Sequence, residues 1–298
     1  MLSRRRHEPS AGRTEAAVLD FAHCVGSSGW EARLDLKFRQ LGGRSVLAER
    51  RHEGPLVIQK PLYPEGPEIC HAILVHAPGG IAAGDQLCLD VQLADETQVL
   101  MTTPAATKWY RSDGRRARQS ASFAVGENAT LEWLPQGTIF FDRADAEAVT
   151  TVQLAASAVY AGWDIVSLGR HASGERFRSG RLRQRLKLFR RSRLLWNESL
   201  ALAGDDPLMH SSVGFRGEPV FGSMIVAAGA VPQELLDACR ALSARGGEGR
   251  VTALPQVFSA RYLGRSTEAV FDYFERLRGV LRPWYAGRPA LRARIWNT

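Results

Sequence analysis

Apolar and polar residues alternate along much of the chain before residue 230. Leu34, Leu36 and Phe38 are separated by charged residues, and the same two-residue period runs through 87–93 and 182–188. Such alternation is typical of a strand with one buried face. Further strands are predicted at 44–50, 56–60, 69–76, 97–103, 118–125, 129–134, 149–154 and 158–168. Because Gly- and Pro-rich turns separate these segments, the pattern predicts a mainly β body over residues 29–230.

After residue 230 the apolar residues recur at helical spacing. Residues 232–244 and 267–281 each place their apolar side chains on one face, and the second run stops before Pro283. Residues 251–262 between them are predicted as a strand, which makes 231–298 a helix-strand-helix part packed on the β body. The polar residues 1–28 have no sustained period and predict a disordered tail. No repeat of 20–50 residues is visible in the sequence.

The composition is that of a globular protein of one large or two modest domains. The chain has 298 residues, 45% of them hydrophobic, and its four cysteines are scattered. No apolar run is long enough for a membrane-spanning helix, and no apolar segment follows Arg4, Arg5 and Arg6 to make a secretory signal. These features predict a reduced, cytoplasmic location.

Arginine supplies almost all of the positive charge. The net charge is +8, and only Lys37, Lys60, Lys108 and Lys187 among the 39 basic residues are lysine. The excess of arginine indicates either recognition of phosphates and carboxylates or the codon bias of a G+C-rich genome. Four of these charges, from Arg181 to Lys187, share one face of a predicted strand and suggest a nucleic-acid site, a solvated face or an interface with an acidic partner.

The common catalytic motifs are absent from the sequence. It contains no GxxxxGK[ST], no GxGxxG after a strand and no GxSxG, and His52-Glu53 is followed by Pro55 where a zinc-binding helix would continue. Cys70, His71 and His76 are the densest group of possible metal ligands. On one regular strand, however, Cys70 and His76 lie about 20 Å apart and His71 points to the other face, so the three cannot chelate one ion.

Five polar residues stand within otherwise apolar or Gly- and Pro-rich stretches. They are Asp85, Thr107, Lys108, Asp164 and Glu198. Because an unpaired buried charge is costly, such residues are paired, hydrogen-bonded or placed along a wet cavity. The pattern alone fits equally well with ordinary turn and rim positions.

Read in order, about ten segments of the chain resemble the UreD (UreH) family of urease accessory proteins. The resemblance runs from about residue 29 to residue 298. It rests chiefly on GWEARLDLKF (29–38), QKPLYPEGPEICH (59–71), HAPGGIAAGDQL (76–87), TTPAATKWYRS (102–112), LEWLPQ (131–136), GWDIVSLGR (162–170), LLWNE (194–198), PVFGS (219–223) and RIWNT (294–298).

The resemblance implies a scaffold chaperone for urease maturation and not an enzyme. It implies a complex with UreF, recruitment of the GTPase UreG and docking on the urease apoprotein, where nickel is delivered to a carbamylated lysine. It also implies a solenoid-like winding of the strands. We expect no tightly bound cofactor, with Ni²⁺ in transit through a polar channel lined by Asp85, Thr107, Lys108, Asp164 and Glu198. A closed four-ligand site would hold the ion too tightly for release.

Two functions of other classes remain open from the residues alone. A basic β protein could bind nucleic acid through the Arg181–Lys187 stripe, although no aromatic residues are interleaved with it. A hydrolase could use two carboxylates such as Asp85 and Glu198, if the fold brought them close together. His210, in the Ser-rich stretch 204–214, is either a surface residue without a role or a contact for a partner or metal.

Overall fold

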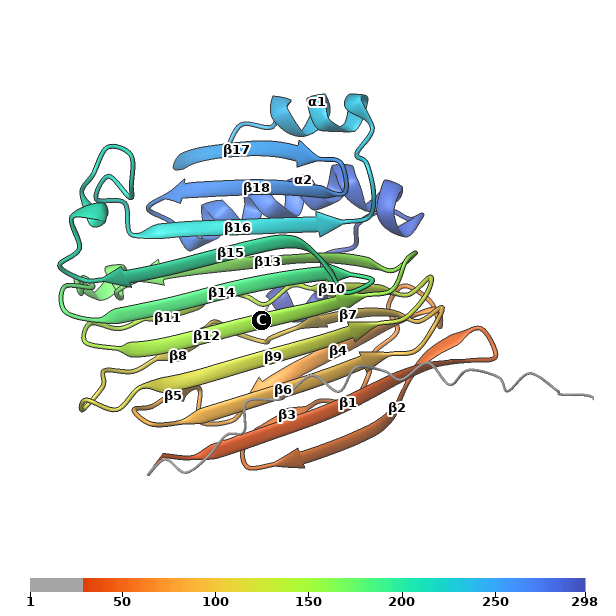
Figure 1. Ribbon diagram of the computed structural model, residues 1–298, viewed down its shortest axis with the longest axis horizontal. Coiled ribbons are helices and arrows are strands. Elements are labelled where there is room, and N and C mark those ends of the chain that lie inside the picture. Colours follow the sequence, from red (N-terminus) through yellow and green to blue (C-terminus); the bar gives the residue numbers. More distant parts are fainter. Residues whose placement is uncertain (1–28, 298) are drawn as a thin grey trace, which may run out of the picture.

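The computed structural model describes residues 29–297 and is dominated by strands wound into a solenoid (Figure 1). The predicted tail, 1–28, lies outside the described residues. The first wall of the solenoid consists of β4 (Ile69–His76), β7 (Gln98–Thr102), β10 (Thr130–Trp133) and β13 (Val159–Leu168). The second consists of β5 (Gly80–Ile81), β8 (Thr107–Trp109) and β11 (Thr138–Phe140). The third consists of β6 (Gln86–Leu93), β9 (Ala117–Val125), β12 (Asp145–Leu154) and β14 (Arg181–Arg190).

Neighbouring strands in each wall are parallel, as a chain that winds repeatedly in one direction requires. Along the first wall, Ile69 pairs with Gln98, Gln98 with Thr130, and Thr130 with Val159. One coil therefore takes about 30 residues, the period of a solenoid. The mainly β, solenoid-like fold class is confirmed. The repeat is absent from the sequence because each interior position requires only an apolar side chain of suitable size, and not a particular residue.

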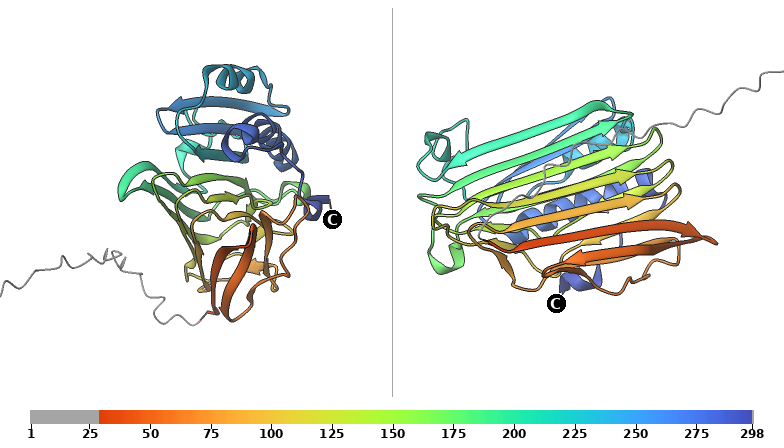
Figure 2. Two further views of the ribbon diagram at one scale, coloured as in Figure 1. Left: turned by 90° about the vertical axis from the view of Figure 1, so that its right-hand side faces the viewer. Right: turned by 60° about the horizontal axis from the view of Figure 1, so that its bottom comes forward.

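Antiparallel strands extend the solenoid at both ends. At one end, β1 (Glu31–Leu41) lies parallel to β6 and antiparallel to β2 (Arg44–Glu53), while β3 (Leu56–Ile58) pairs with β4. At the other end, β15 (Arg193–Ala203) pairs with β14, and β16 (Val220–Ala227) pairs with β13. The first and second walls thus belong to one sheet of eleven strands, and the third wall belongs to a sheet of seven (Figure 2, left).

Strand β13 separates two apolar cores. Tyr160, Val166 and Leu168 point into the solenoid, whereas Trp163 and Ile165 point outward beneath α2. The outer core is covered by α2 (Thr267–Ala286), which packs across β13, β16 and β18. The shorter α1 (Gln233–Ala241) packs against β17 and α2. The two predicted C-terminal helices are confirmed.

The structure corrects two details of the C-terminal part. Where one strand was predicted, a hairpin of β17 (Gly247–Leu254) and β18 (Val257–Gly264) is present. Residues 257–260 are all buried, so the two-residue period that would have marked the second strand is lost. Helix α2 also continues through Pro283, because its last turn carries Arg282 and Tyr285 into buried polar contacts.

Those contacts form an ion network that fixes α2 to the solenoid. The carboxylate of Glu132 on β10 accepts hydrogen bonds from Arg278 (2.8 Å), Arg282 (3.0 Å) and the Tyr285 hydroxyl (2.7 Å). Arg282 also pairs with Glu65, which lies 2.7 Å from Nε2 of His71. Although burial raises the pKa of Glu65, hydrogen bonds from His71 and Arg282 lower it to about 2. We call these six residues the helix-anchoring network.

The remaining short elements are 3-10 turns: η1 (His171–Ser173), η2 (Pro207–Met209) and η3 (Arg294–Asn297). In η3, the indole of Trp296 donates a hydrogen bond to the Thr102 hydroxyl (2.7 Å), which attaches the end of the described chain to β7. None of the helices found between residues 29 and 297 combines the length and the apolar character needed to cross a membrane.

Candidate functional site

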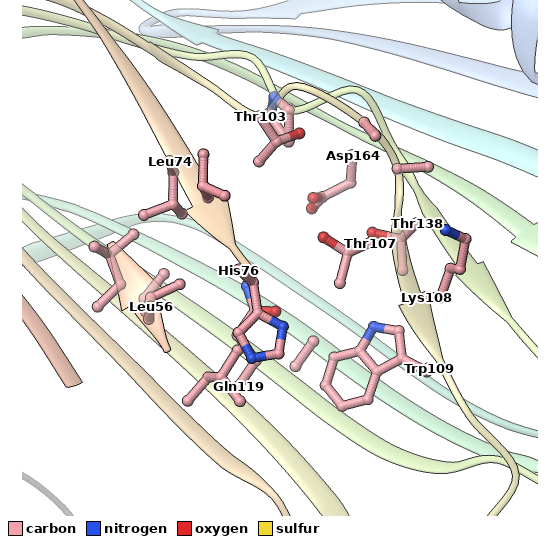
Figure 3. Close-up of a pocket in the computed structure, with 18 of the residues that line it drawn as sticks. Leu56, Leu74, His76, Thr103, Thr107, Lys108, Trp109, Gln119, Thr138 and Asp164 are labelled. Atoms are coloured by element: carbon pink, nitrogen blue, oxygen red, sulfur yellow. The ribbon is translucent and has the colours of Figure 1, made fainter. Parts of the chain in front are cut away.

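The interior of the solenoid is not completely filled. A cavity of about 160 Å³ lies between the walls, lined by residues from β3, β4, β6 and β8 to β14 and by the loop before β8 (Figure 3). A cavity of this size has room for several water molecules. We call this space the main cavity.

Three of the five predicted site residues line the main cavity. Thr107 and Lys108 come from β8, and Asp164 comes from β13. Side chains along β13 alternate between the two sides of the strand. Asp164 is an even number of residues from Tyr160 and Val166 and faces inward with them, whereas its neighbours Trp163 and Ile165 face α2. Figure 3 shows the Thr107 hydroxyl and the Asp164 carboxylate on the same side of the space.

Asp164 is the most perturbed carboxylate of the cavity. Burial, followed by the negative charge of Glu198, raises its pKa to about 6, and a hydrogen bond from Gln184 only partly opposes this. The side chain is half-buried and lines the main cavity. A carboxyl group of this kind changes readily between its neutral and charged forms near neutral pH.

His76 also lines the main cavity, at the end of β4. Its Nδ1 is buried and makes no hydrogen bond within the described chain, and burial lowers the pKa of the imidazole. The lowered pKa favours the neutral ring, whose Nδ1 has no hydrogen-bond partner within the described chain. The prediction that Cys70, His71 and His76 do not chelate one ion is consistent with the structure, because His71 belongs to the helix-anchoring network and the described residues hold no group of three such ligands.

A second, smaller cavity of about 30 Å³ adjoins the main one. Asp164 and Gln184 line both spaces. The other residues that line the second are Leu186, Glu198, Leu200, Phe221 and Ser223. Glu198, the fourth predicted residue, accepts hydrogen bonds from Trp196 (3.2 Å) and Ser223 (3.1 Å) and forms an ion pair with Arg261. These contacts join β15 of one sheet to β16 and β18 of the other, at the end of the solenoid.

Asp85, the fifth predicted residue, lines neither cavity. Its carboxylate accepts hydrogen bonds from the backbone amides of Trp30 (3.0 Å) and Ala82 (2.8 Å), and it is 8% exposed. The structure therefore gives Asp85 a role in holding the turn before β6, and a place in the channel stays a prediction. His210 is exposed after η2, and its role also stays a prediction.

Several residues that line the cavities were not predicted as residues of the channel. They are His76, Gln119, Thr138 and Gln184, with Ser223 in the second cavity. Gln184 carried a usable signal, because it is the one uncharged polar residue among inward-facing leucines of β14. Within residues 29–297, no group of three or more His, Cys, Asp and Glu side chains is arranged to hold a metal ion. The described cavities therefore offer dispersed oxygen and nitrogen ligands and no closed chelating site.

The fold and the site define a class of protein: a β solenoid with two adjoining interior cavities, packed against a C-terminal helix. The model of the UreD urease accessory protein family matches residues 31–297. Urease accessory protein UreD of Methylobacillus flagellatus is 52% identical over 270 residues, covering 90% of this chain and 95% of the relative. The UreD protein of Dechloromonas aromatica is 48% identical over 276 residues, covering 91% and 96%.

The chain therefore belongs to the UreD urease accessory protein family. The family and its relatives are named as accessory proteins of urease, and membership supports a role in urease maturation.

Proposed function

We propose that this chain is a urease maturation scaffold through which Ni²⁺ passes as cargo on its way to the urease apoprotein. The observation that carries the proposal is that Asp164 and Gln184 line both interior cavities. One carboxylate and one amide thus stand where the two spaces meet. A cation that enters the main cavity would find its next oxygen ligand at Asp164 and the one after it at Glu198.

The side chains that line the main cavity favour the passage of Ni²⁺ over its tight binding. Nickel binds well to imidazole nitrogen and also accepts carboxylate and water oxygens. His76 and Asp164 supply one ligand of each kind, and Thr107 and Gln119 supply neutral oxygens. Because the pKa of Asp164 is about 6, a proton competes with the metal for this carboxylate. Proton uptake at Asp164 would accordingly promote release toward Glu198.

The scaffold part of the proposal concerns partners. We propose that the chain assembles in the cytoplasm with UreF and the GTPase UreG and docks on the urease apoprotein, as the family resemblance implies. Its open-ended sheets and the exposed Trp30 and Leu194 provide surface for such assembly. Catalysis by the chain itself has no part in the proposal.

The test is to co-express the chain with UreF, UreG and urease, and to measure complex formation and nickel in the purified urease separately. Asp164→Asn keeps the shape of the side chain and removes its charge. We expect the accessory complex to elute as for the parent chain, while nickel content and urease activity fall by about tenfold or more, because a carboxylate attracts a nearby cation by a few kcal/mol.

Asp90→Asn is the matched control, since Asp90 lies on the outer side of the solenoid in β6. It should leave both readouts unchanged. Full nickel loading of urease by the Asp164→Asn chain would contradict the passage of nickel through this point. Failure of the unsubstituted chain to co-elute with UreF and UreG would contradict the scaffold itself.

A further inference from the structure

Four cations stand in a row on the outer face of the seven-stranded sheet. Arg181, Arg183, Arg185 and Lys187 occupy alternate positions of β14, and the residues between them point inward. At about 3.3 Å per residue the row is about 20 Å long, with a positive charge every 6 to 7 Å or so. We call it the cationic row.

The neighbouring strands do not neutralise this charge. On β12, Asp145 and Glu147 lie beside Arg181 and Arg183, but they form ion pairs with Arg116 (2.7 Å) and Arg118 (3.2 Å) from the β9 side. Beside Arg185 and Lys187, β12 carries uncharged Val149 and Thr151. Within residues 29–297, none of the four cations forms an ion pair. Each of the four positions in the cationic row therefore keeps a net charge of about +1.

The strand on the other side leaves the row accessible. The register partners on β15 are short and uncharged: Ala203, Ala201, Ser199 and Asn197. Strand β15 is also the edge of its sheet, as Figure 1 shows, so nothing beyond it within the sheet covers the row. Because the partners on β15 are short, the four side chains of the cationic row extend beyond them. A partner can therefore approach the row from the face of the sheet and from its edge.

We propose that the cationic row is a docking surface for an acidic partner protein, which presents an extended segment with carboxylates at alternate residues. An extended chain places every second side chain on one face at the spacing of the row, so four carboxylates can each meet one cation. Single-stranded nucleic acid fits less well, because no aromatic side chain is interleaved with the four cations. The aromatic residue among the outward positions of β14 is Phe189, which lies beyond Lys187 at the end of the row.

This surface lies outside the cavities, so the inference goes beyond the proposed function and its test needs no nickel. The probe is a fluorescent peptide of alternating Glu and Thr, titrated with the full chain at low salt and at about 0.15 M salt. The variant replaces Arg181, Arg183, Arg185 and Lys187 by Gln. With exposed pairs at roughly 0.5 kcal/mol each, we expect the affinity to fall by about 30-fold.

The matched control replaces Arg33, Lys37 and Arg39 by Gln at the opposite edge of the same sheet. These cations are equally exposed but already pair with Asp35 and Glu49, so peptide affinity should change by less than about twofold. Equal losses in both variants would overturn the proposal, as would equal binding of a peptide with the same residues in two blocks. Tighter binding of oligothymidylate, lost in the first variant, would assign the row to nucleic acid instead. The first variant should also weaken co-elution with at least one of UreF, UreG and urease.

Discussion

The helix-anchoring network and the main cavity both bury a carboxylate, but the pKa of that carboxylate is lowered in the network and raised in the cavity. Glu132 is surrounded by two guanidinium groups and a hydroxyl, and although burial raises its pKa, these partners hold it below the usual value. Burial and the neighbouring negative charge of Glu198 raise the pKa of Asp164, and its single amide partner, Gln184, only partly opposes them. Complete pairing fixes a helix in place, whereas incomplete pairing leaves a group free to exchange protons and ligands.

The largest effect is expected from breaking the anchor. Glu132→Gln leaves Arg278 and Arg282, both almost fully buried, without their shared carboxylate. Removing one partner of a buried ion pair costs about 3–5 kcal/mol. We therefore expect the free energy of unfolding, measured by chemical denaturation, to fall by that amount, or the chain to become insoluble.

Glu49→Gln is the comparison for this change, because Glu49 pairs with Lys37 and Arg39 on the surface. It should cost less than about 1 kcal/mol. Equal stability losses in the two variants would contradict the view that complete pairing beneath α2 is what holds the helix.

A change of opposite sign is expected at Asp164. Its pKa is 3.8 in the reference state and about 6 in the folded chain, so folding favours the protonated form. The stability of the parent chain should therefore fall as the pH rises from about 4 through 6, and remain lower above that range. Asp164→Asn removes this penalty and should stabilise the chain at pH 8 by about 3 kcal/mol at most.

Thermal denaturation across this pH range measures the effect. The difference between Asp164→Asn and the parent chain should shrink toward zero as the pH approaches about 4. A variant that is less stable than the parent chain at pH 8 would show that Asp164 is a paired, structural carboxylate like Glu132.

The smallest effect on stability is expected from Thr107→Val. The hydroxyl faces the main cavity, and the substitution keeps the branched shape of the side chain. Stability should change by less than about 1 kcal/mol, while nickel loading of co-expressed urease should fall by a measurable factor. Ser122→Ala on the outer face of β9 is the control for loading. Loading that is unchanged by Thr107→Val would remove this hydroxyl from the proposed path.

Local patterns were sufficient to predict most elements and part of the site. Alternation located β1, β6 and β14, and helical spacing located α1 and α2. Thr107, Lys108 and Asp164 were recognised as polar residues in apolar surroundings, and they line one cavity. Asp85 had the same appearance in the sequence, but backbone amides already satisfy its carboxylate.

Contacts between distant residues lay beyond these patterns. Arg278 and Arg282 have the spacing of an ordinary charged stripe on a helix, and only the fold brings Glu132, about 150 positions earlier, between them. The meeting of two cavities at Asp164 and Gln184 likewise depends on the register of β13 and β14 in different walls. The relative register of these two strands cannot be derived from the local pattern of apolar and polar residues.

The position of β13 between two cores also limits which insertions and deletions this strand can tolerate. Because consecutive side chains point to opposite sides, deleting one residue early in β13 would bring an indole into the main cavity and a carboxylate beneath α2. Single-codon insertions and deletions are therefore expected to be purged within this strand and tolerated in the turns between walls. A deep mutational scan that includes such changes would find β13 intolerant of odd-numbered shifts and more tolerant of a shift by two.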